Sequence, residues 1–147
     1  HDENRLVYQS TEFEGHFLQD ACKRSKVGAT ILLTSHGVPM IYQGQEFAQN
    51  APIKDAGGMP IPQPLQWGNL EDEVVLDLNE HYKKLVSLRN EYDVLKEPPL
   101  EVKYTNDGNK TLIYWRVNEG EKIVIAVNLD TNEHTIDLEF PNNGSLI

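Results

Sequence analysis

The stretch Gly37-Val38-Pro39-Met40-Ile41-Tyr42-Gln43-Gly44-Gln45-Glu46 decides how the rest of the chain is interpreted. Its apolar positions, with a proline near the start where a missing N–H is least costly, predict a short buried strand. Gly44 permits a sharp turn, and the polar residues Gln45 and Glu46 follow it. A buried strand that ends in polar side chains is how α/β proteins line a site, so a site is predicted at its carboxyl end.

Helical patterns flank this strand on both sides. Residues 16–35 place small and apolar side chains at steps of three and four, which predicts a helix ending near Gly37. Residues 9–15 are predicted to be a loop, and residues 45–69 a long ordered loop beside the site, because prolines and glycines interrupt them while apolar residues remain. A second helix is predicted over residues 76–95. It carries one apolar stripe, which consists of Leu78, Tyr82, Leu85, Leu88, Tyr92 and Leu95.

The pattern changes from helical to alternating after Pro98-Pro99, which marks the expected domain boundary. Four strands joined by short turns are predicted to form an antiparallel sheet. They span residues 100–104, 111–117, 123–129 and 134–140. The expected fold class is therefore α/β plus all-β, with an α/β part over residues 1–97 and an antiparallel β part, expected to be incomplete, over residues 98–147.

Composition narrows the function classes. The 147 residues carry 13 Lys and Arg against 23 Asp and Glu, a net charge of −10, which argues against nucleic acid or an anionic membrane surface as a partner. The single cysteine, Cys22, excludes an intrachain disulfide and a multi-cysteine metal site, and it is predicted to be a small buried hydrophobe. Because the chain opens with His1 and not with Met, we expect that the gene starts earlier. The cellular location is left open, although the cytoplasm is preferred. The oligomeric state is left open as well.

Five phrases, in this order along the chain, resemble the C-terminal part of the α-amylase superfamily of glycoside hydrolases. The phrases are His1-Asp2 followed by Glu3-Asn4-Arg5, the stretch 37–46, Gln63-Pro64-Leu65-Gln66-Trp67, Leu85-Val86-Ser87-Leu88-Arg89-Asn90-Glu91, and the strands over residues 111–128. The first is similar to the end of the family's seventh barrel strand, and the second to its eighth. The resemblance extends from His1 to about Phe140.

The resemblance implies a fold and an activity. The family folds as a (β/α)8 TIM barrel followed by an antiparallel β-sandwich, domain C. Residues 1–97 would then be the last strand–helix units of the barrel and residues 98–147 part of domain C. The parent protein would hydrolyse or transfer α-glucosidic bonds in starch, glycogen or maltooligosaccharides by a retaining mechanism, which needs two carboxylates. In the family these lie on the fourth and fifth strands, outside this chain, so the chain alone is expected to be inactive.

The resemblance also assigns candidate site residues. Asp2 matches the third acidic residue of the family, which binds sugar hydroxyls, and His1 would donate a hydrogen bond beside it. Glu46 is either a sugar contact or a structural carboxylate, and Gln66 and Trp67 either line a sugar subsite or anchor a loop. No metal ligands and no cofactor are predicted in this chain, while Ca²⁺ is allowed in the rest of the parent.

Three alternatives remain beside the hydrolase. An α-glucan branching enzyme or another transglycosidase would carry the same phrases. A barrel that has lost catalysis and serves as a partner subunit of a membrane transporter is disfavoured by the intact Asp2. A free-standing carbohydrate-binding β module is disfavoured by the amphipathic stripe over residues 76–95.

Overall fold

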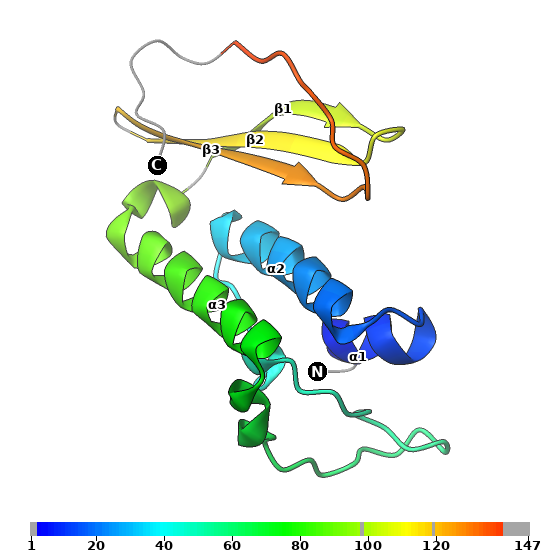
Figure 1. Cartoon of the computed structure of the whole chain (residues 1–147). Helices are drawn as coiled ribbons and strands as arrows, with labels where there is room; N and C mark the ends of the chain where they lie inside the picture. The colour runs from blue at the N-terminus through cyan, green and yellow to red at the C-terminus, as the bar shows by residue number, and fades with distance from the viewer. Residues whose placement is uncertain (1–2, 98, 119, 140–147) are drawn as a thin grey trace.

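The computed structural model describes residues 3–97, 99–118 and 120–139. Two long helices lie side by side, and an antiparallel sheet lies across their carboxyl ends (Figure 1). The amino ends of the helices and a long irregular loop are at the opposite pole. The coarse prediction of helices followed by an antiparallel sheet is therefore confirmed, whereas the division into two domains at residues 97 and 98 stays a prediction.

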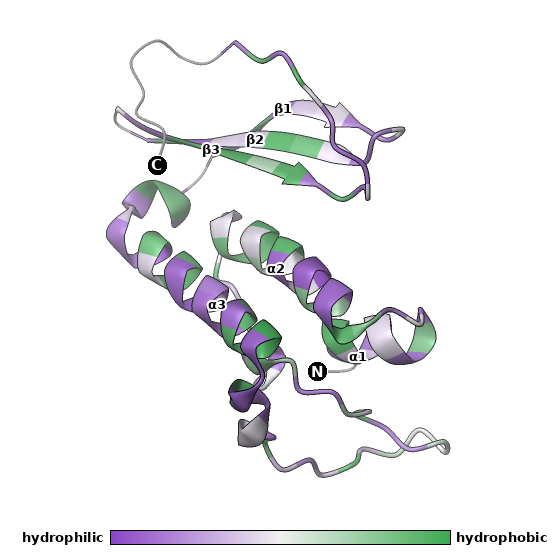
Figure 2. Cartoon of the chain, in the orientation of Figure 1, coloured by the Kyte–Doolittle hydropathy of each residue, from purple (hydrophilic) through white to green (hydrophobic). Residues whose placement is uncertain are grey.

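The helices form where the sequence pattern is strongest. Helix α2 spans Leu18–Thr34 and helix α3 spans Glu73–Glu91, followed by the 3₁₀ turn η4 over Asp93–Leu95. Asp72 caps α3, since its side chain accepts hydrogen bonds from the N–H groups of Val74 (2.8 Å) and Val75 (3.4 Å). Both helices are amphipathic and alternate hydrophobic with hydrophilic colours along their length in Figure 2.

The main core lies between the two helices. Ala21 and Ala29 of α2 are fully buried, and their small side chains allow α3 to approach with Leu78 and Tyr82. Cys22 is a buried free thiol, as predicted. Further members of this core are Val7, Leu33, Phe47, Ala48, Val75 and Leu85. Burial of this apolar surface is what holds the helical layer together.

The sheet contains three strands among the described residues, in the order β1-β2-β3. They are β1 (Leu100–Asn106), β2 (Thr111–Asn118) and β3 (Glu121–Asn128), and both pairings are antiparallel. The middle of β2 and β3 is hydrophobic (Figure 2). Tyr114, Ile125 and Val127 face the helices and pack with Val27 and Ile31 of α2. On the other face, the Lys103 ammonium lies 4.7 Å from the centre of the Trp115 ring.

Two buried arginines bind backbone carbonyls at the place where the helices meet the sheet. Arg89 of α3 donates to the carbonyls of Leu33 (2.8 Å), Ser35 (2.9 Å) and Leu95 (2.8 Å), and also to Gly37. Arg116 of β2 is fully buried and donates to the carbonyls of Thr34 (2.7 Å) and Leu95 (3.1 Å). It also donates to the carbonyl of Glu97. The unpaired carbonyls at the end of α2 are thus satisfied by side chains from two other elements.

Three predictions about secondary structure are wrong. The predicted buried strand in the stretch 37–46 has no regular secondary structure over residues 38–42, and Val38 and Met40 are 99% and 70% exposed. Its sequence suits a strand, but a strand needs a neighbour to pair with, and no described strand lies beside it. The predicted loop over residues 9–15 is mostly helical: α1 (Leu6–Tyr8) continues into the π-helical turn η1 (Gln9–Phe13), because Val7 and Ser10 are buried there.

The third correction concerns the predicted fourth strand. Residues 134–139 form no strand, and Phe140 lies outside the described residues. The segment after β3 passes back across the sheet (orange to red in Figure 1) without a ladder. Its side chains still alternate between half-buried and exposed, with Ile136 and Leu138 half-buried. The alternation therefore reports which side chains face the sheet and not a hydrogen-bonded pairing.

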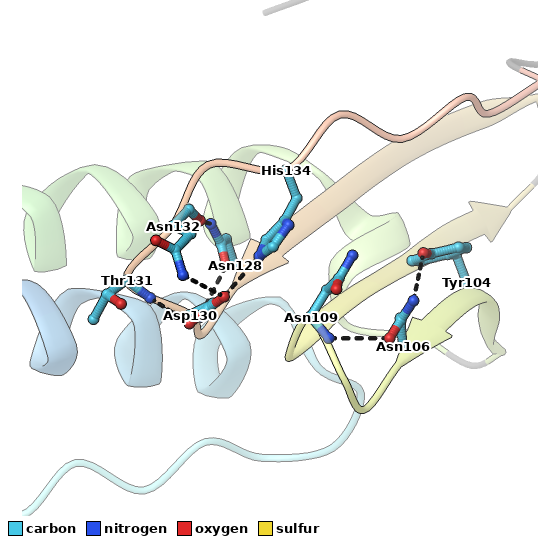
Figure 3. A network of polar contacts seen from close by, with 8 residues as sticks. All are labelled: Tyr104, Asn106, Asn109, Asn128, Asp130, Thr131, Asn132 and His134. Atoms are coloured by element: carbon cyan, nitrogen blue, oxygen red, sulfur yellow. Dashed lines mark hydrogen bonds and ion pairs between the residues drawn. The ribbon is translucent and has the colours of Figure 1, made fainter.

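A polar turn connects β3 to this segment (Figure 3). The Asp130 carboxylate accepts hydrogen bonds from His134 Nε2 (2.8 Å), the Thr131 N–H (2.8 Å) and Asn132 Nδ2 (3.3 Å). Asn128 accepts from the Asp130 N–H at 2.9 Å. The hydrogen bond from His134 is the largest cause that lowers the pKa of the Asp130 carboxyl to about 2.

Replacing Arg116 by Met should lower the free energy of unfolding by about 3 kcal/mol or more, because buried carbonyls lose their donors. Urea unfolding followed by far-UV circular dichroism measures the change. Arg24→Met is the matched control, since Arg24 makes a half-exposed ion pair with Glu14 at 3.1 Å, which contributes at most about 1 kcal/mol. Equal losses in the two variants would contradict a special role for Arg116.

The Asp130 turn should make stability depend on pH in acid. The folded pKa is lowered below the ordinary aspartate value, so its stabilising contribution is present above about pH 4 and is lost as the pH falls towards about 2. Asp130→Asn should therefore show a shallower loss of stability across this range than the natural protein, measured by thermal unfolding at a series of pH values. Asp137→Asn, at an exposed position, should keep the natural pH profile. Identical profiles for both variants would refute the assignment.

Candidate functional site

The stretch 37–46 contains a tight turn at Gly44. Gly44 has a φ of 90°, and the 3₁₀ turn η2 (Gln45–Phe47) begins directly after it. The N–H of Gln49 donates to the carbonyl of Gly44 at 2.9 Å, and the Gln49 side chain is packed against the glycine. A Cβ atom at position 44 would lie 2.7 Å from Gln49 Oε1 and 2.8 Å from Gln49 Cβ, so both the backbone conformation and the space require glycine.

The buried side chain of Gln49 holds the carboxyl end of the loop over residues 50–66. Its Nε2 donates to the carbonyl of Pro64 (3.3 Å), and its Oε1 accepts from the N–H of Gln66 (3.4 Å). The Gln66 side chain returns the contact, since its Oε1 accepts from the N–H of Asn50 (3.2 Å). These bonds connect the first and last residues of the loop and fix it to the turn at Gly44.

The middle of the loop is fixed to the amino-terminal segment. Asn4 Oδ1 accepts from the N–H of Ile53 at 3.3 Å, and Arg5 Nη1 donates to Gln63 Oε1 at 3.1 Å. Between these points the loop makes its own tight turn, in which Asp55 Oδ1 accepts from the N–H groups of Gly57 and Met59, both at 2.9 Å. The loop is therefore ordered, as the sequence analysis predicts, although it contains little regular structure.

A cleft of about 410 Å³ opens where the amino-terminal segment meets residues 40–45. Glu3, Asn4 and Arg5 line one side, and Tyr42 and Gln45 line the other. The walls carry an acid, a cation, amides and an aromatic ring beside the apolar side chains of Leu6 and Met40. Such a mixture can donate and accept hydrogen bonds with a polyhydroxylated ligand and can stack on the ring.

The residues predicted from sequence are brought only partly together. Trp67 lies in the 3₁₀ turn η3 (Trp67–Glu71), is 61% exposed, and stacks on the buried Phe47 ring with centroids 4.9 Å apart and an angle of 29°. Gln66 precedes it, but the Gln66 amide oxygen bonds the loop backbone. Trp67 is thus an exposed ring that is also held in place by Phe47. Both interpretations from the sequence, a ring that lines a sugar subsite and a ring that anchors the loop, stay open.

Glu46 faces the helices. Its backbone carbonyl accepts from Asn79 Nδ2 at 3.2 Å, and its Oε2 is buried with no hydrogen-bond partner among the described residues. Burial raises the pKa of the nearby Tyr82 phenol, and the Glu46 carboxylate adds to the increase. The Tyr82 hydroxyl also accepts a hydrogen bond from Gln45 Nε2 at 3.0 Å. Because the hydrogen bond from Asn79 reaches the backbone of Glu46 and not its carboxylate, the choice between a structural carboxylate and a sugar contact stays a prediction.

His1 and Asp2 lie outside the described residues. The sequence reasoning did not select Gln49 or Gln63 as site residues, and for Arg5 it left open an ion pair near the site or a position facing solvent. No local pattern distinguishes these polar residues from the many others in the chain, since each acts on partners far away in sequence. The nearest signal is the position of Arg5, three residues after Asp2 in the first phrase.

Among residues 3–97, 99–118 and 120–139, no group of three or more His, Cys, Asp and Glu side chains could hold a metal ion. No helix within the same ranges is both long and apolar enough to cross a membrane.

No protein-family profile matches the chain. Over 86 residues, or 58% of this chain, it is 37% identical to an amylopullulanase from Thermoanaerobacter thermohydrosulfuricus. That match covers 5% of the relative, so the chain spans only a small part of its length.

Two solved structures share the fold. A debranching enzyme from Nostoc punctiforme superposes with a TM-score of 0.65 at 23% identity, covering 87% of this chain and 23% of that one. An α-amylase from H. orenii superposes with a TM-score of 0.51 at 24% identity, covering 76% and 27%. The resemblance predicted from the five phrases is confirmed by these matches.

Substituting Gly44 by Ala should destabilise the protein by about 3 kcal/mol, because a left-handed alanine is strained and its Cβ also displaces Gln49. Gly58→Ala is the matched control. Gly58 has a similar φ of 81°, but nothing lies within 4 Å of its Cβ position, so we expect only the strain, about 1 kcal/mol. Thermal unfolding compares the two variants, and an equal loss in both would show that the contact with Gln49 is unimportant.

Proposed function

Because the chain matches a segment of α-amylase superfamily glycoside hydrolases in sequence and in fold, we propose that it belongs to an enzyme acting on α-glucans. Residues 1–97 are the last strand–helix units of a (β/α)8 barrel, and residues 98–147 are part of domain C. The parent enzyme cleaves α-glucosidic bonds in starch, glycogen or maltooligosaccharides by a retaining mechanism.

The observation that carries this proposal is the segment between α2 and α3. Val38 and Met40 are exposed in a segment whose sequence suits a buried strand. This is the state expected for a barrel strand described without its two neighbours, since those strands would cover its side chains and bond its backbone. The order helix, strand-like segment, polar turn, loop and helix is also that of a barrel unit.

The polar turn and loop supply the carboxyl-end face of that unit. In (β/α)8 barrels the active site lies at this face, and here it carries the Trp67 platform. An exposed indole supported from below by Phe47 can stack on the apolar face of a glucosyl ring at little entropic cost. We assign Trp67 to a sugar subsite on this basis, and Gln66 to holding the loop.

Asp2 has the chemical role of binding sugar hydroxyls. A carboxylate accepts charge-assisted hydrogen bonds from two neighbouring hydroxyls, and these strengthen as positive charge develops on the ring in the transition state. His1 donates to an adjacent hydroxyl. The nucleophile and the acid/base carboxylate that a retaining reaction requires come from elsewhere in the parent enzyme, so the 147-residue chain does not hydrolyse glucans by itself.

The decisive experiment uses the parent enzyme with starch, pullulan and maltooligosaccharides as substrates. Asp2→Asn should reduce kcat by about 100-fold or more, because the lost contact acts on the transition state. Asp20→Asn is the control, since Asp20 is on the surface of α2, paired with Lys23 at 3.3 Å, and should leave the rate unchanged. Full activity in Asp2→Asn would refute the role of Asp2.

The same assay separates the competing functions. A natural enzyme that releases reducing sugars is a hydrolase. One that builds new linkages on an added acceptor, with little release, is a transglycosidase. A parent with no activity on any α-glucan would overturn the proposal in favour of a non-catalytic barrel.

A further inference from the structure

Two largely exposed phenylalanine rings flank the turn that precedes α2. Phe13 is the last residue of η1 and is 65% exposed, and Phe17 is the N-cap residue of α2 and is 84% exposed. The Phe13 ring meets the Tyr8 ring edge to face, with centroids 6.0 Å apart. Exposed aromatic side chains that cluster in this way are typical of a binding surface.

The backbone between the two rings is fixed to the rest of the fold. The His16 N–H donates to the carbonyl of Ser10 at 3.0 Å, and the Glu14 carboxylate accepts from Arg24 Nη1 of α2 at 3.1 Å. Gly15 allows the chain to reverse between them, since its φ is 70°. Because this turn is already ordered, a ligand that stacks on the rings has to immobilise little more than two short side chains.

Hydrogen bonds connect this turn to the exposed Trp67 ring. The Thr11 hydroxyl of η1 is shared between the carbonyl of Val7 (3.1 Å) and Asn50 Oδ1 (3.2 Å). The Asn50 N–H donates to Gln66 Oε1 at 3.2 Å, and Gln66 directly precedes Trp67. The segment of α1 and η1 lies at the same end of the molecule as the irregular loop (Figure 1). The two aromatic places are therefore linked through a single residue, Asn50.

The polar neighbours of the rings suit a carbohydrate. Gln9 and Glu12 of η1 are exposed, as is Asn50, and Gln9 also lines the cleft beside Arg5. A glucosyl unit has an apolar face that stacks on an aromatic ring and hydroxyl groups that need hydrogen-bond partners. A purely apolar partner would leave these amide and carboxylate groups unpaired, which is costly. The surroundings thus favour a sugar chain as the occupant.

We propose that Phe13 and Phe17 form an additional subsite for glucosyl units, which makes the parent enzyme bind long α-glucan chains better than short ones. The inference rests on the proposed function, because it extends the sugar site from Trp67 across Asn50 to the turn before α2. A short maltooligosaccharide occupies one of the two aromatic places, and a long chain occupies both. Units bound at the phenylalanines do not react, so the rings act on affinity and not on the chemical step.

The test uses the parent enzyme with soluble starch and with maltotriose. Phe13→Leu combined with Phe17→Leu keeps the apolar character but removes the flat rings. The KM for starch should therefore rise about tenfold, while kcat and the KM for maltotriose stay unchanged. Phe13→Tyr combined with Phe17→Tyr keeps the rings and should retain the natural KM for starch. Leu129→Ala is the surface control, since Leu129 is 56% exposed beside the sheet, and it should change neither constant.

Two further measurements separate stacking from packing. Electrophoresis in gels that contain starch reports binding without turnover, and the leucine variant should be retarded less than the natural enzyme and the tyrosine variant. Thermal unfolding reports whether another part of the parent covers the rings. The leucine variant should unfold at the natural temperature, because exposed rings contribute little to folding.

The outcomes separate this inference from the proposed function. If the natural parent cleaves starch and the leucine variant keeps its KM for starch, the subsite is refuted and the proposed function stands. If the leucine variant is less stable and its KM rises equally for both substrates, the rings pack inside the parent and the subsite is again refuted. If the natural parent neither cleaves nor binds any α-glucan, the proposed function fails and the subsite fails with it.

Discussion

The arrangement of helices and sheet depends on two buried guanidinium groups. Arg89 comes from α3 and Arg116 from β2, and both donate to the carbonyl of Leu95 while dividing the carbonyls at the end of α2 between them. The carboxyl end of a helix carries partial negative charge, so cations are favourable there. Two like charges can share this small volume because backbone carbonyls surround them. The sheet therefore has one way to sit on the helices.

The hydrogen bonds made by Arg89 and Arg116 are therefore as important for the arrangement of helices and sheet as the apolar core. Tyr114 packs in the small core under the sheet, and its hydroxyl also bonds Thr34 Oγ1 at the end of α2. A sheet of three strands with one covered face has little apolar area of its own. Directional bonds from Arg116 and Tyr114 supply the orientation that hydrophobic contact alone does not specify.

The sequence predicts those parts of the fold that are determined locally. Helices α2 and α3 and strands β1 to β3 have a clear period, a cap such as Asp72, or a turn signal, and each forms close to its expected place. Residues 38–42 and 134–139 have strand-like sequences but no ladder, since pairing depends on a neighbour and not on the segment itself. The site follows the same rule. Trp67 could be selected from a phrase, but Arg5 and Gln63 are 58 residues apart, and no local pattern connects them.

The two tryptophans of the chain occupy very different surroundings. Trp67 stands exposed on Phe47 at the pole of the irregular loop, while Trp115 lies in the sheet beneath the Lys103 ammonium. Each half of the molecule thus contains its own intrinsic fluorophore, and no label is needed to observe them separately. When tryptophan is excited selectively over the tyrosines, removing either indole leaves one tryptophan emission, which comes from one half. If Arg89 and Arg116 couple the helices to the sheet, the two tryptophan signals should change together during unfolding.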